Sequence, residues 1–269
     1  MRLLQLSDLH VRCPGNPLAG RVETLPYLER AVTFVERMLP EPDAIIVTGD
    51  VADQMETAEY ELARGMLRRL RRPCFALPGN HDSRRGMREL LPFCLREPLR
   101  EDCLAYVVEQ LPLRLVMLDS VIPGHGDGRL GGDQLAWLDS VLAAAPSSPS
   151  LLAVHHPPFE TGIGFMDRIG LNDRAALGEV VARHGQVVGI VAGHVHRTIV
   201  GSLAGRVALT APSVAHQIPL DLSPDGPDTF VLEPPGFLLH EWDGTSLRSH
   251  HGYLGDFGAW HRFDEGTDG

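Results

Sequence analysis

Several features are scarce in this chain of 269 residues, and each scarcity excludes a class of protein. No CxxC pair occurs among its four cysteines, Cys13, Cys74, Cys94 and Cys103, so neither a thiolate zinc site nor a redox motif is indicated. We expect free thiols in a reducing compartment. No apolar run approaches the roughly 18 residues that a membrane-spanning helix needs, and no signal peptide follows Met1. We therefore expect a soluble cytoplasmic protein.

Positive charge is also in short supply. Lys and Arg together number 24 against 35 for Asp and Glu, which gives a formal net charge of −11. Nucleic-acid polymers and anionic membranes are bound through basic surfaces, so we expect neither as a partner. Histidine, in contrast, is abundant, with 13 residues. This count directs attention to imidazole chemistry.

Two local patterns alternate along the first 200 residues. Short apolar, β-branched runs predict buried strands, and segments with apolar residues every three to four positions predict helices between them. This alternation is typical of an α/β fold. The predicted strands are 3–6, 44–48, 74–77, 114–118, 151–154, 187–192 and 207–210, and the predicted helices are 25–39 after a Thr24 cap, 62–70, 135–142 and one from about 172 to Gly185.

The pattern changes after about residue 200, where helical periodicity disappears. Two strands are predicted at 237–242 and 246–254, and Asp243-Gly244 between them is a hairpin turn signal. We therefore divide the chain into a catalytic core (1–199), a small β-rich cap that continues the core (200–255) and a tail (256–269). The apolar hairpin predicts a homodimer or higher homo-oligomer through the cap, because a bare apolar edge favours pairing with another chain. The alternative is that the hairpin folds back onto its own core.

Polar residues that can bind metal follow the ends of five predicted strands. Ligands of open α/β sheets lie beyond the carboxyl ends of strands, so these side chains are expected to converge. They comprise carboxylates, an amide and imidazoles without a nearby thiolate, a set that suits Fe, Mn, Zn or Co. Their number is too large for one catalytic ion with an open position and fits two divalent ions. The residues are Asp8, His10, Asp50, Asn80, His155, His194 and His196.

The order Asp-x-His, Gly-Asp, Gly-Asn-His-Asp, His and Gly-His-x-His resembles the signature of calcineurin-like metallophosphoesterases. These motifs extend from Asp8 to His196, over most of the chain. His155-His156-Pro157-Pro158 and the short cap make the sequence most similar to bacterial class III cyclic-nucleotide phosphodiesterases and glycerophosphodiesterases. The resemblance implies a four-layer αββα sandwich of two mixed β-sheets flanked by helices.

The resemblance also implies a role for each residue that matches the motifs. Asp8, His10 and His196 correspond to ligands of a first metal, Asn80, His155 and His194 correspond to ligands of a second, and Asp50 bridges the two. His81 matches a histidine that is not a ligand. It contacts the phosphoryl oxygen or protonates the leaving alkoxide, which makes it the catalytic residue. Asn80, His81 and His216 are the expected substrate-binding residues.

Other polar residues receive weaker expectations. Asp82 is expected to orient a loop or His81, and Asp119 to brace loops. His156 is expected to be structural more often than functional. His125 lies in a glycine-rich stretch where a solvated loop is the more common outcome, and Asp53 is interpreted as a turn or cap residue. No functional role is predicted for His184, His240, His250, His251 or His261.

The predicted activity is dinuclear-metal-dependent hydrolysis of a small soluble phosphodiester by a metal-activated water that attacks phosphorus. The resemblance implies the substrate class, which is a 3′,5′-cyclic nucleotide such as cyclic AMP or a glycerophosphodiester. Two related activities compete: a phosphomonoesterase with the same metals, and a nuclease, which the net charge disfavours. A non-catalytic scaffold is the alternative of another class, and it is disfavoured because no ligand of the motif set is missing.

Overall fold

Two mixed β-sheets form the centre of the computed structural model, which describes residues 1–259 and 261–263. The first sheet has five strands in the order β11-β10-β1-β2-β3. Its parallel part consists of β1 (Arg2–Leu6), β2 (Ala44–Thr48) and β3 (Cys74–Leu77). The antiparallel hairpin of β10 (Gly236–Trp242) and β11 (Leu247–Tyr253) continues it beyond β1.

The second sheet has six strands in the order β4-β5-β6-β7-β9-β8. Its centre is parallel, and the short strands at both edges run antiparallel to their neighbours. The strands are β4 (Tyr106–Val108), β5 (Arg114–Met117), β6 (Ser150–Ala153), β7 (Val187–Ala192), β8 (Ile199–Leu203) and β9 (Arg206–Thr210).

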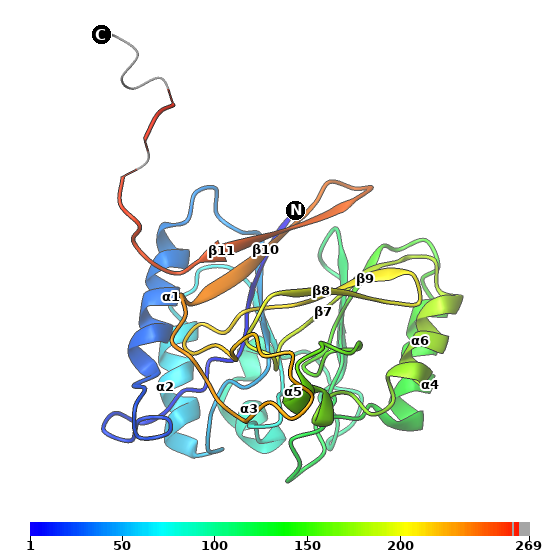
Figure 1. Cartoon of the computed structure of the whole chain (residues 1–269). Helices are drawn as coiled ribbons and strands as arrows, with labels where there is room; N and C mark the ends of the chain where they lie inside the picture. Colours follow the sequence, from blue (N-terminus) through cyan, green and yellow to red (C-terminus); the bar gives the residue numbers. More distant parts are fainter. Residues whose placement is uncertain (260, 264–269) are drawn as a thin grey trace.

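Helices cover the outer face of each sheet (Figure 1). On one side lie α1 (Leu25–Arg37), α2 (Thr57–Leu67) and α3 (Arg84–Leu90), with the 3₁₀ turn η1 (Pro92–Cys94). On the other lie α4 (Gly131–Ala143) and α6 (Arg174–Arg183), and the short α5 (Gly164–Arg168) lies near the loops. The architecture is the predicted four-layer sandwich, confirmed by both sheets and their helices.

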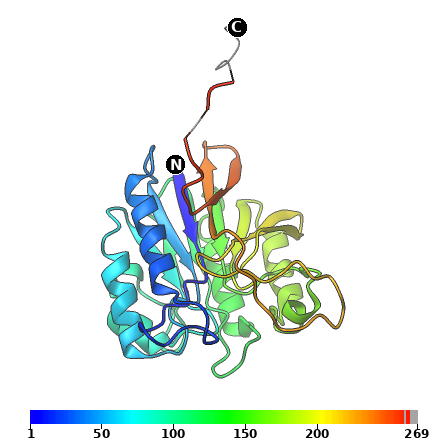
Figure 2. The ribbon, with the colours of Figure 1, turned by 60° about the vertical axis from the view of Figure 1, so that its left-hand side comes forward.

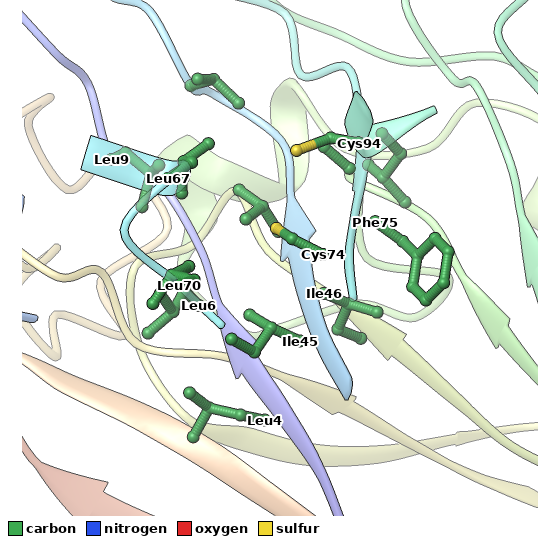
Figure 3. Close-up of a cluster of buried hydrophobic side chains, with 14 of the residues drawn as sticks. Leu4, Leu6, Leu9, Ile45, Ile46, Leu67, Leu70, Cys74, Phe75 and Cys94 are labelled. Carbon is green, nitrogen blue, oxygen red and sulfur yellow. The ribbon is translucent and has the colours of Figure 1, made fainter. Parts of the chain in front are cut away.

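Burial on both faces explains why the central strands are continuous apolar runs. All five residues of β2 are buried, because helices cover one face and the second sheet covers the other. Side chains of β1, β2 and β3 join Leu67 and Leu70 from the end of α2 and its following turn in one cluster (Figure 3). This core holds the parallel strands in place, so their carboxyl ends are fixed relative to one another.

Several boundaries differ from the predictions. The second helix begins at Thr57 rather than near residue 62, because Glu56 and Glu59 form a capping box at its start. Thr24 precedes α1 but makes no side-chain cap; its hydroxyl accepts a hydrogen bond from the Arg12 backbone instead. The sequence patterns also missed α3, α5, β4 and β8, which are short.

The segment after residue 200 contributes to both sheets. Strand β9 extends the second sheet beside β7, and β10 pairs with β1 of the same chain (Figure 2). The hairpin therefore folds back onto its own core, where Phe237 and Trp242 are buried, and β11 is the free edge. Within the predicted tail, residue 260 and the acidic stretch 264–269 lie outside the described residues.

Candidate metal centre

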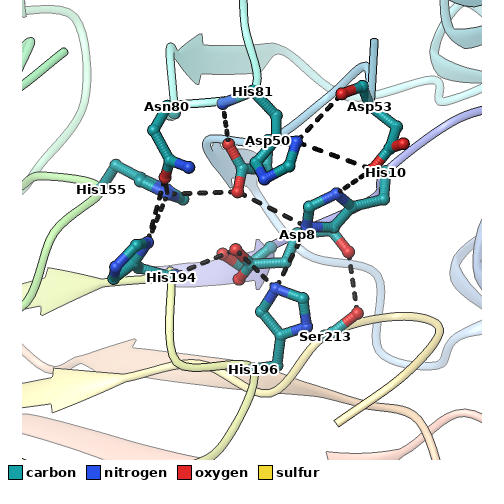
Figure 4. A network of polar contacts seen from close by, with 12 residues as sticks. Asp8, His10, Asp50, Asp53, Asn80, His81, His155, His194, His196 and Ser213 are labelled. Atoms are coloured by element: carbon teal, nitrogen blue, oxygen red, sulfur yellow. Dashed lines mark hydrogen bonds and ion pairs between the residues drawn. The ribbon is translucent and has the colours of Figure 1, made fainter. Parts of the chain in front are cut away.

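Seven polar side chains from strand ends of both sheets meet at one place (Figure 4). Asp8 and His10 follow β1, Asp50 follows β2 and Asn80 follows β3, all in the first sheet. The second sheet contributes His155 after β6, and His194 and His196 after β7. Every predicted ligand is thus present in one cluster, which straddles the two sheets.

The first set of possible ligand atoms consists of Asp8, His10, Asp50 and His196, and these atoms lie within 4.8 Å of one another. The Nε2 atoms of His10 and His196 are 3.1 Å apart. His196 Nε2 lies 3.5 Å from Asp8 Oδ1, and His10 Nε2 lies 3.5 Å from Asp50 Oδ2. The set therefore encloses a space of the size that a single coordinated ion requires.

The second set joins Asn80, His155 and His194 to the other side of Asp50. Asn80 Oδ1 lies 3.0 Å from His155 Nε2 and 3.1 Å from His194 Nδ1, and these two nitrogens are 3.2 Å apart. Asp50 Oδ2 is 3.3 Å from His155 Nε2. Because the same oxygen also faces His10, Asp50 lies between the two sets.

Each imidazole of the cluster has its outward nitrogen engaged by an acceptor. His10 Nδ1 faces Asp53 Oδ1 at 2.9 Å, and the Nδ1 atoms of His155 and His196 face the backbone carbonyls of Thr48 and His216 at 2.8 and 2.9 Å. His194 is turned the other way, with Nε2 facing the Ile169 carbonyl at 3.0 Å. Since these outward nitrogens donate, the nitrogen that faces the centre carries, in the neutral ring, the lone pair with which a metal is bound.

The charges of the cluster attract positive charge. Burial lowers the pKa of His155, but Asp50 and Asp8 outweigh that effect and raise it to about 9. Asp8 is buried, and its Oδ2 has no hydrogen-bond partner within the described part of the chain. Converging buried acceptor atoms need a cation, because facing lone pairs repel. The donor set therefore fits transition-metal ions.

A cavity of about 520 Å³ opens over this cluster. His81 lines it with a partly exposed side chain; its Nδ1 bonds to the Asp53 carbonyl at 2.9 Å, and its backbone N–H donates to Asp50 Oδ1 at 2.9 Å. His216 also lines the cavity, with its ring 4.5 Å from that of His196. Its buried Nδ1 has no hydrogen-bond partner among the described residues. The apolar part of the wall comes from Leu18, Phe165, Met166, Ile169, Ile218 and Phe230.

The residues with weaker expectations are found in supporting contacts. Asp82 accepts hydrogen bonds from the backbone N–H groups of Val51, Ala52 and Gly79, each at 3.0 Å, so it orients the loops as expected. Asp119 braces loops through Arg84 and the Leu104 backbone.

His156 and His125, whose roles the sequence left undecided, differ in exposure. His156 is buried, and both its ring nitrogens are engaged, by Ser120 Oγ at 2.7 Å and by the Gly126 carbonyl at 3.0 Å. Burial and the charge of His155 lower its pKa to about 3. These contacts tie the 120–128 loop to the strand end that bears His155. His125 is exposed and lies 3.5 Å from Asp127.

Asp53 was misjudged from the sequence. It is a buried carboxylate that holds His10 and also bonds to Arg12 and Gln54, rather than a turn or cap residue. The N-cap of α2 is Glu56. The signal available for Asp53 was its position three residues after Asp50, in the same strand-end loop. A carboxylate commonly orients a metal-binding histidine.

Comparison with known proteins agrees with this geometry. The family model for calcineurin-like phosphoesterases matches residues 1–198. A probable glycerophosphodiester phosphodiesterase of Arcobacter nitrofigilis is 34% identical over 260 residues, with 96% of this chain and 94% of the relative covered. A 3′,5′-cyclic adenosine monophosphate phosphodiesterase of Escherichia coli strain K12 is 30% identical, with 93% and 89% covered.

Solved structures show the same fold at low sequence identity. A dimetal phosphatase from Danio rerio has a TM-score of 0.68 at 15% identity and covers 92% of this chain and 98% of its own. Three findings together establish the family: the family model matches most of the chain, a relative is 34% identical over 96% of it, and the strand-end cluster is present. The chain belongs to the calcineurin-like phosphoesterase family, and it is a metal-dependent hydrolase of phosphoric esters.

Proposed function

We propose that this enzyme hydrolyses small soluble phosphodiesters, either 3′,5′-cyclic nucleotides such as cyclic AMP or glycerophosphodiesters, with two divalent transition ions held by the strand-end cluster. The carrying observation is the placement of Asp50 Oδ2, 3.5 Å from His10 Nε2 and 3.3 Å from His155 Nε2. One carboxylate oxygen that faces both ligand sets fits a bridge between two ions. The first ion would be held by Asp8, His10, Asp50 and His196, and the second by Asp50, Asn80, His155 and His194.

When bound, two such ions supply Lewis-acid stabilisation of a phosphoryl group and activation of a water molecule. The protein positions the other groups. The Asp53 backbone carbonyl orients His81 by accepting a hydrogen bond from Nδ1. When the ring carries both protons, Nε2 would donate to a phosphoryl oxygen or protonate the leaving alkoxide. Asn80 and His216 line the same cavity and would contact the substrate. Asp50 is held in place by the His81 backbone N–H.

The size and lining of the cavity support small substrates. Its volume of about 520 Å³ is in the range typical of small-molecule sites, and its apolar wall suits the non-phosphate part of a diester. The relatives act, by their names, on glycerophosphodiesters and on cyclic nucleotides. The net charge of −11 supports a protein without nucleic-acid or membrane partners. No helix among the described residues is long and apolar enough to cross a membrane. We infer a cytoplasmic location from the four free cysteines, which suit a reducing compartment.

Self-association is a further part of this proposal. Strand β11 is a free edge of the first sheet, and Tyr253 at its end is 53% exposed. Pairing of β11 with the same strand of a second copy would extend the sheet and cover that edge. We infer a homodimer formed in this way.

A substrate panel with manganese-loaded protein tests the activity. It contains cyclic AMP, glycerophosphoethanolamine, p-nitrophenyl phosphate and single-stranded DNA. We expect turnover of the small diesters in preference to the monoester and the polymer, up to two bound ions per chain by elemental analysis, and loss of activity in chelator. Full diesterase activity in protein shown to be free of metal would refute the mechanism, and turnover of the monoester alone would refute the substrate class.

A further inference from the structure

The metal centre depends on how the two sheets are placed relative to each other. In the first ligand set, His10 and Asp8 belong to the first sheet and His196 to the second, and the contacts of 3.1 and 3.5 Å cross between the sheets. In the second set, Asn80 and Asp50 approach His155 across the same boundary. A small shift of one sheet against the other would therefore change both sites at once.

One buried side chain bonds to both sheets immediately before these loops. Gln5 is the penultimate residue of β1 and is fully buried between aliphatic neighbours, Leu4 and Leu6. Its amide nitrogen donates to Thr48 Oγ1 at 2.9 Å, at the end of β2, and to the Ala192 carbonyl at 2.9 Å, at the end of β7 in the other sheet. Asp50 and His194 lie two residues after Thr48 and Ala192, in the loops that follow these strands.

The Gln5 amide belongs to a hydrogen-bond chain with a single direction. His240 on β10 has both ring nitrogens bonded, Nδ1 to Ser249 Oγ at 2.7 Å and Nε2 to Gln5 Oε1 at 2.9 Å. Burial, with the charge of His250, lowers the pKa of His240 to about 4, so the ring is neutral and donates through one nitrogen. The amide nitrogen of Gln5 must donate, so its oxygen accepts the N–H of His240.

Thr48 links this series of hydrogen bonds to a histidine of the metal centre. The Thr48 hydroxyl accepts from Gln5 and donates to Ser7 Oγ at 2.7 Å. The Thr48 carbonyl accepts the outward N–H of His155 at 2.8 Å. Gln5 thus acts on the residue that orients His155, as well as on the strand that precedes His194. A buried amide costs free energy unless it is bonded, and here both its nitrogen and its oxygen are engaged.

We propose that Gln5 is a positioning residue of the metal centre: its amide fixes the separation of the two sheets where their loops supply ligands, and so sets the spacing of the two metal positions. The inference rests on the proposed dinuclear function. It assigns no contact with metal or substrate to Gln5.

The test compares three single variants of the whole chain and the double variant of the first two. Gln5→Leu keeps the volume and removes the amide, and Thr48→Val removes only the hydroxyl that Gln5 contacts. Gln134→Leu is the matched control. Gln134 is also a buried amide, but it bonds to Asp119 and Leu130 around α4, and within the described residues it has no hydrogen bond to the first sheet. Manganese affinity is measured by calorimetry on metal-free protein, the spacing of bound manganese by electron paramagnetic resonance, and stability by thermal unfolding.

We expect Gln5→Leu and Thr48→Val each to lower manganese affinity by about 10-fold or more, a loss typical of residues that orient ligands. Each variant should also alter the spin coupling between the ions. The double variant should lose less than the sum of the two in free energy, because both remove the same link. Gln134→Leu should lose stability but keep native affinity and spectrum. Thr48→Val carries the test if Gln5→Leu does not fold.

Native affinity and spin coupling in the Gln5 and Thr48 variants would overturn the inference, as would equal losses of affinity in Gln134→Leu. Failure of the proposed function looks different. In that case the unaltered protein itself would bind no coupled pair of ions or would not hydrolyse diesters.

Discussion

Replacing Asp53 by asparagine should weaken metal binding without removing any ligand. Asp53 Oδ1 accepts the His10 Nδ1–H at 2.9 Å, while Oδ2 bonds to Arg12 at 2.5 Å and to Gln54 at 2.9 Å. Burial raises the pKa of Asp53, but the hydrogen bond and charge of His10 outweigh it and hold the pKa below its usual range. The carboxylate is therefore ionised, and it fixes which nitrogen of His10 faces the metal.

The magnitude follows from the number of acceptors. A carboxylate offers two accepting oxygens here, and the amide of asparagine offers one oxygen and a donating nitrogen that faces either His10 or Arg12. One charge-assisted hydrogen bond is lost, worth roughly 1.5–3 kcal/mol. This corresponds to a loss of about 10- to 100-fold in metal affinity, the usual effect of such a partner. It should fall on the set that contains His10 and spare the set of Asn80, His155 and His194.

Calorimetric titration of metal-free protein with manganese measures this effect, with elemental analysis at limiting metal as a second readout. Asp119→Asn is the matched control. Asp119 is also a buried carboxylate bonded to an arginine, Arg84, but in the described part of the chain no hydrogen bond or ion pair joins it to a histidine of the cluster. We expect Asp53→Asn to retain one tightly bound ion and Asp119→Asn to retain the native number. Two sites of native affinity in Asp53→Asn would refute the assigned role.

Three further predictions follow from the same structure. His81→Ala should keep its metals and lose about 10²- to 10⁴-fold in rate, whereas Asp50→Ala should lose metal and activity together. Elemental analysis combined with kinetics checks both variants. Loss of metal in His81→Ala with retention in Asp50→Ala would contradict the assigned roles. Size-exclusion chromatography with light scattering should show a dimer at micromolar concentration, and a monomer would eliminate pairing through β11. The pKa of His240 is lowered from 6.5 to about 4, so the unfolded state binds the proton first as pH falls. The free energy of unfolding should therefore decline by on the order of 3 kcal/mol between about pH 6.5 and 4. Urea unfolding of metal-free protein measures this, and a His240→Gln variant with the same decline would show that the histidine is not its source.

The strand ends that carry chemistry were accessible from the sequence because both signals are local. An apolar run such as 44–48, followed at once by Gly49-Asp50, identifies a strand and its loop without knowledge of the partner strand. All seven predicted ligands accordingly lie in one cluster. The division of the strands between two sheets is not a local property, and it came from the family resemblance.

Features that depend on distant pairing were beyond local patterns. Strand β10 pairs with β1 across more than 230 residues, and no local pattern identified β1 as the partner of the hairpin. For Asp53 the only local signal is its place in the strand-end loop of Asp50, and Gln5 has none. A carboxylate in a loop and an amide in a strand acquire their roles only when His10, Thr48 and Ala192 are placed beside them.

The backbone around the metal centre is strained at most of the predicted ligand positions. Five of the seven predicted ligands have left-handed backbone conformations, with φ between 42° and 70°: Asp8, His10, Asp50, His194 and His196. Each costs an L-residue roughly 1–2 kcal/mol, so the conformation persists only where the surroundings enforce it. Gly79 and Gly193 show how close those surroundings are, because a Cβ on Gly79 would meet Asp50 and one on Gly193 would meet the Thr48 carbonyl at 2.7 Å. Hydrogen bonds hold the strained residues, from Asp8 N to the Gly49 carbonyl at 3.1 Å and from His194 N to Asp8 Oδ1 at 3.0 Å. Part of the stability of the two packed sheets is thus used to hold these residues in strained conformations.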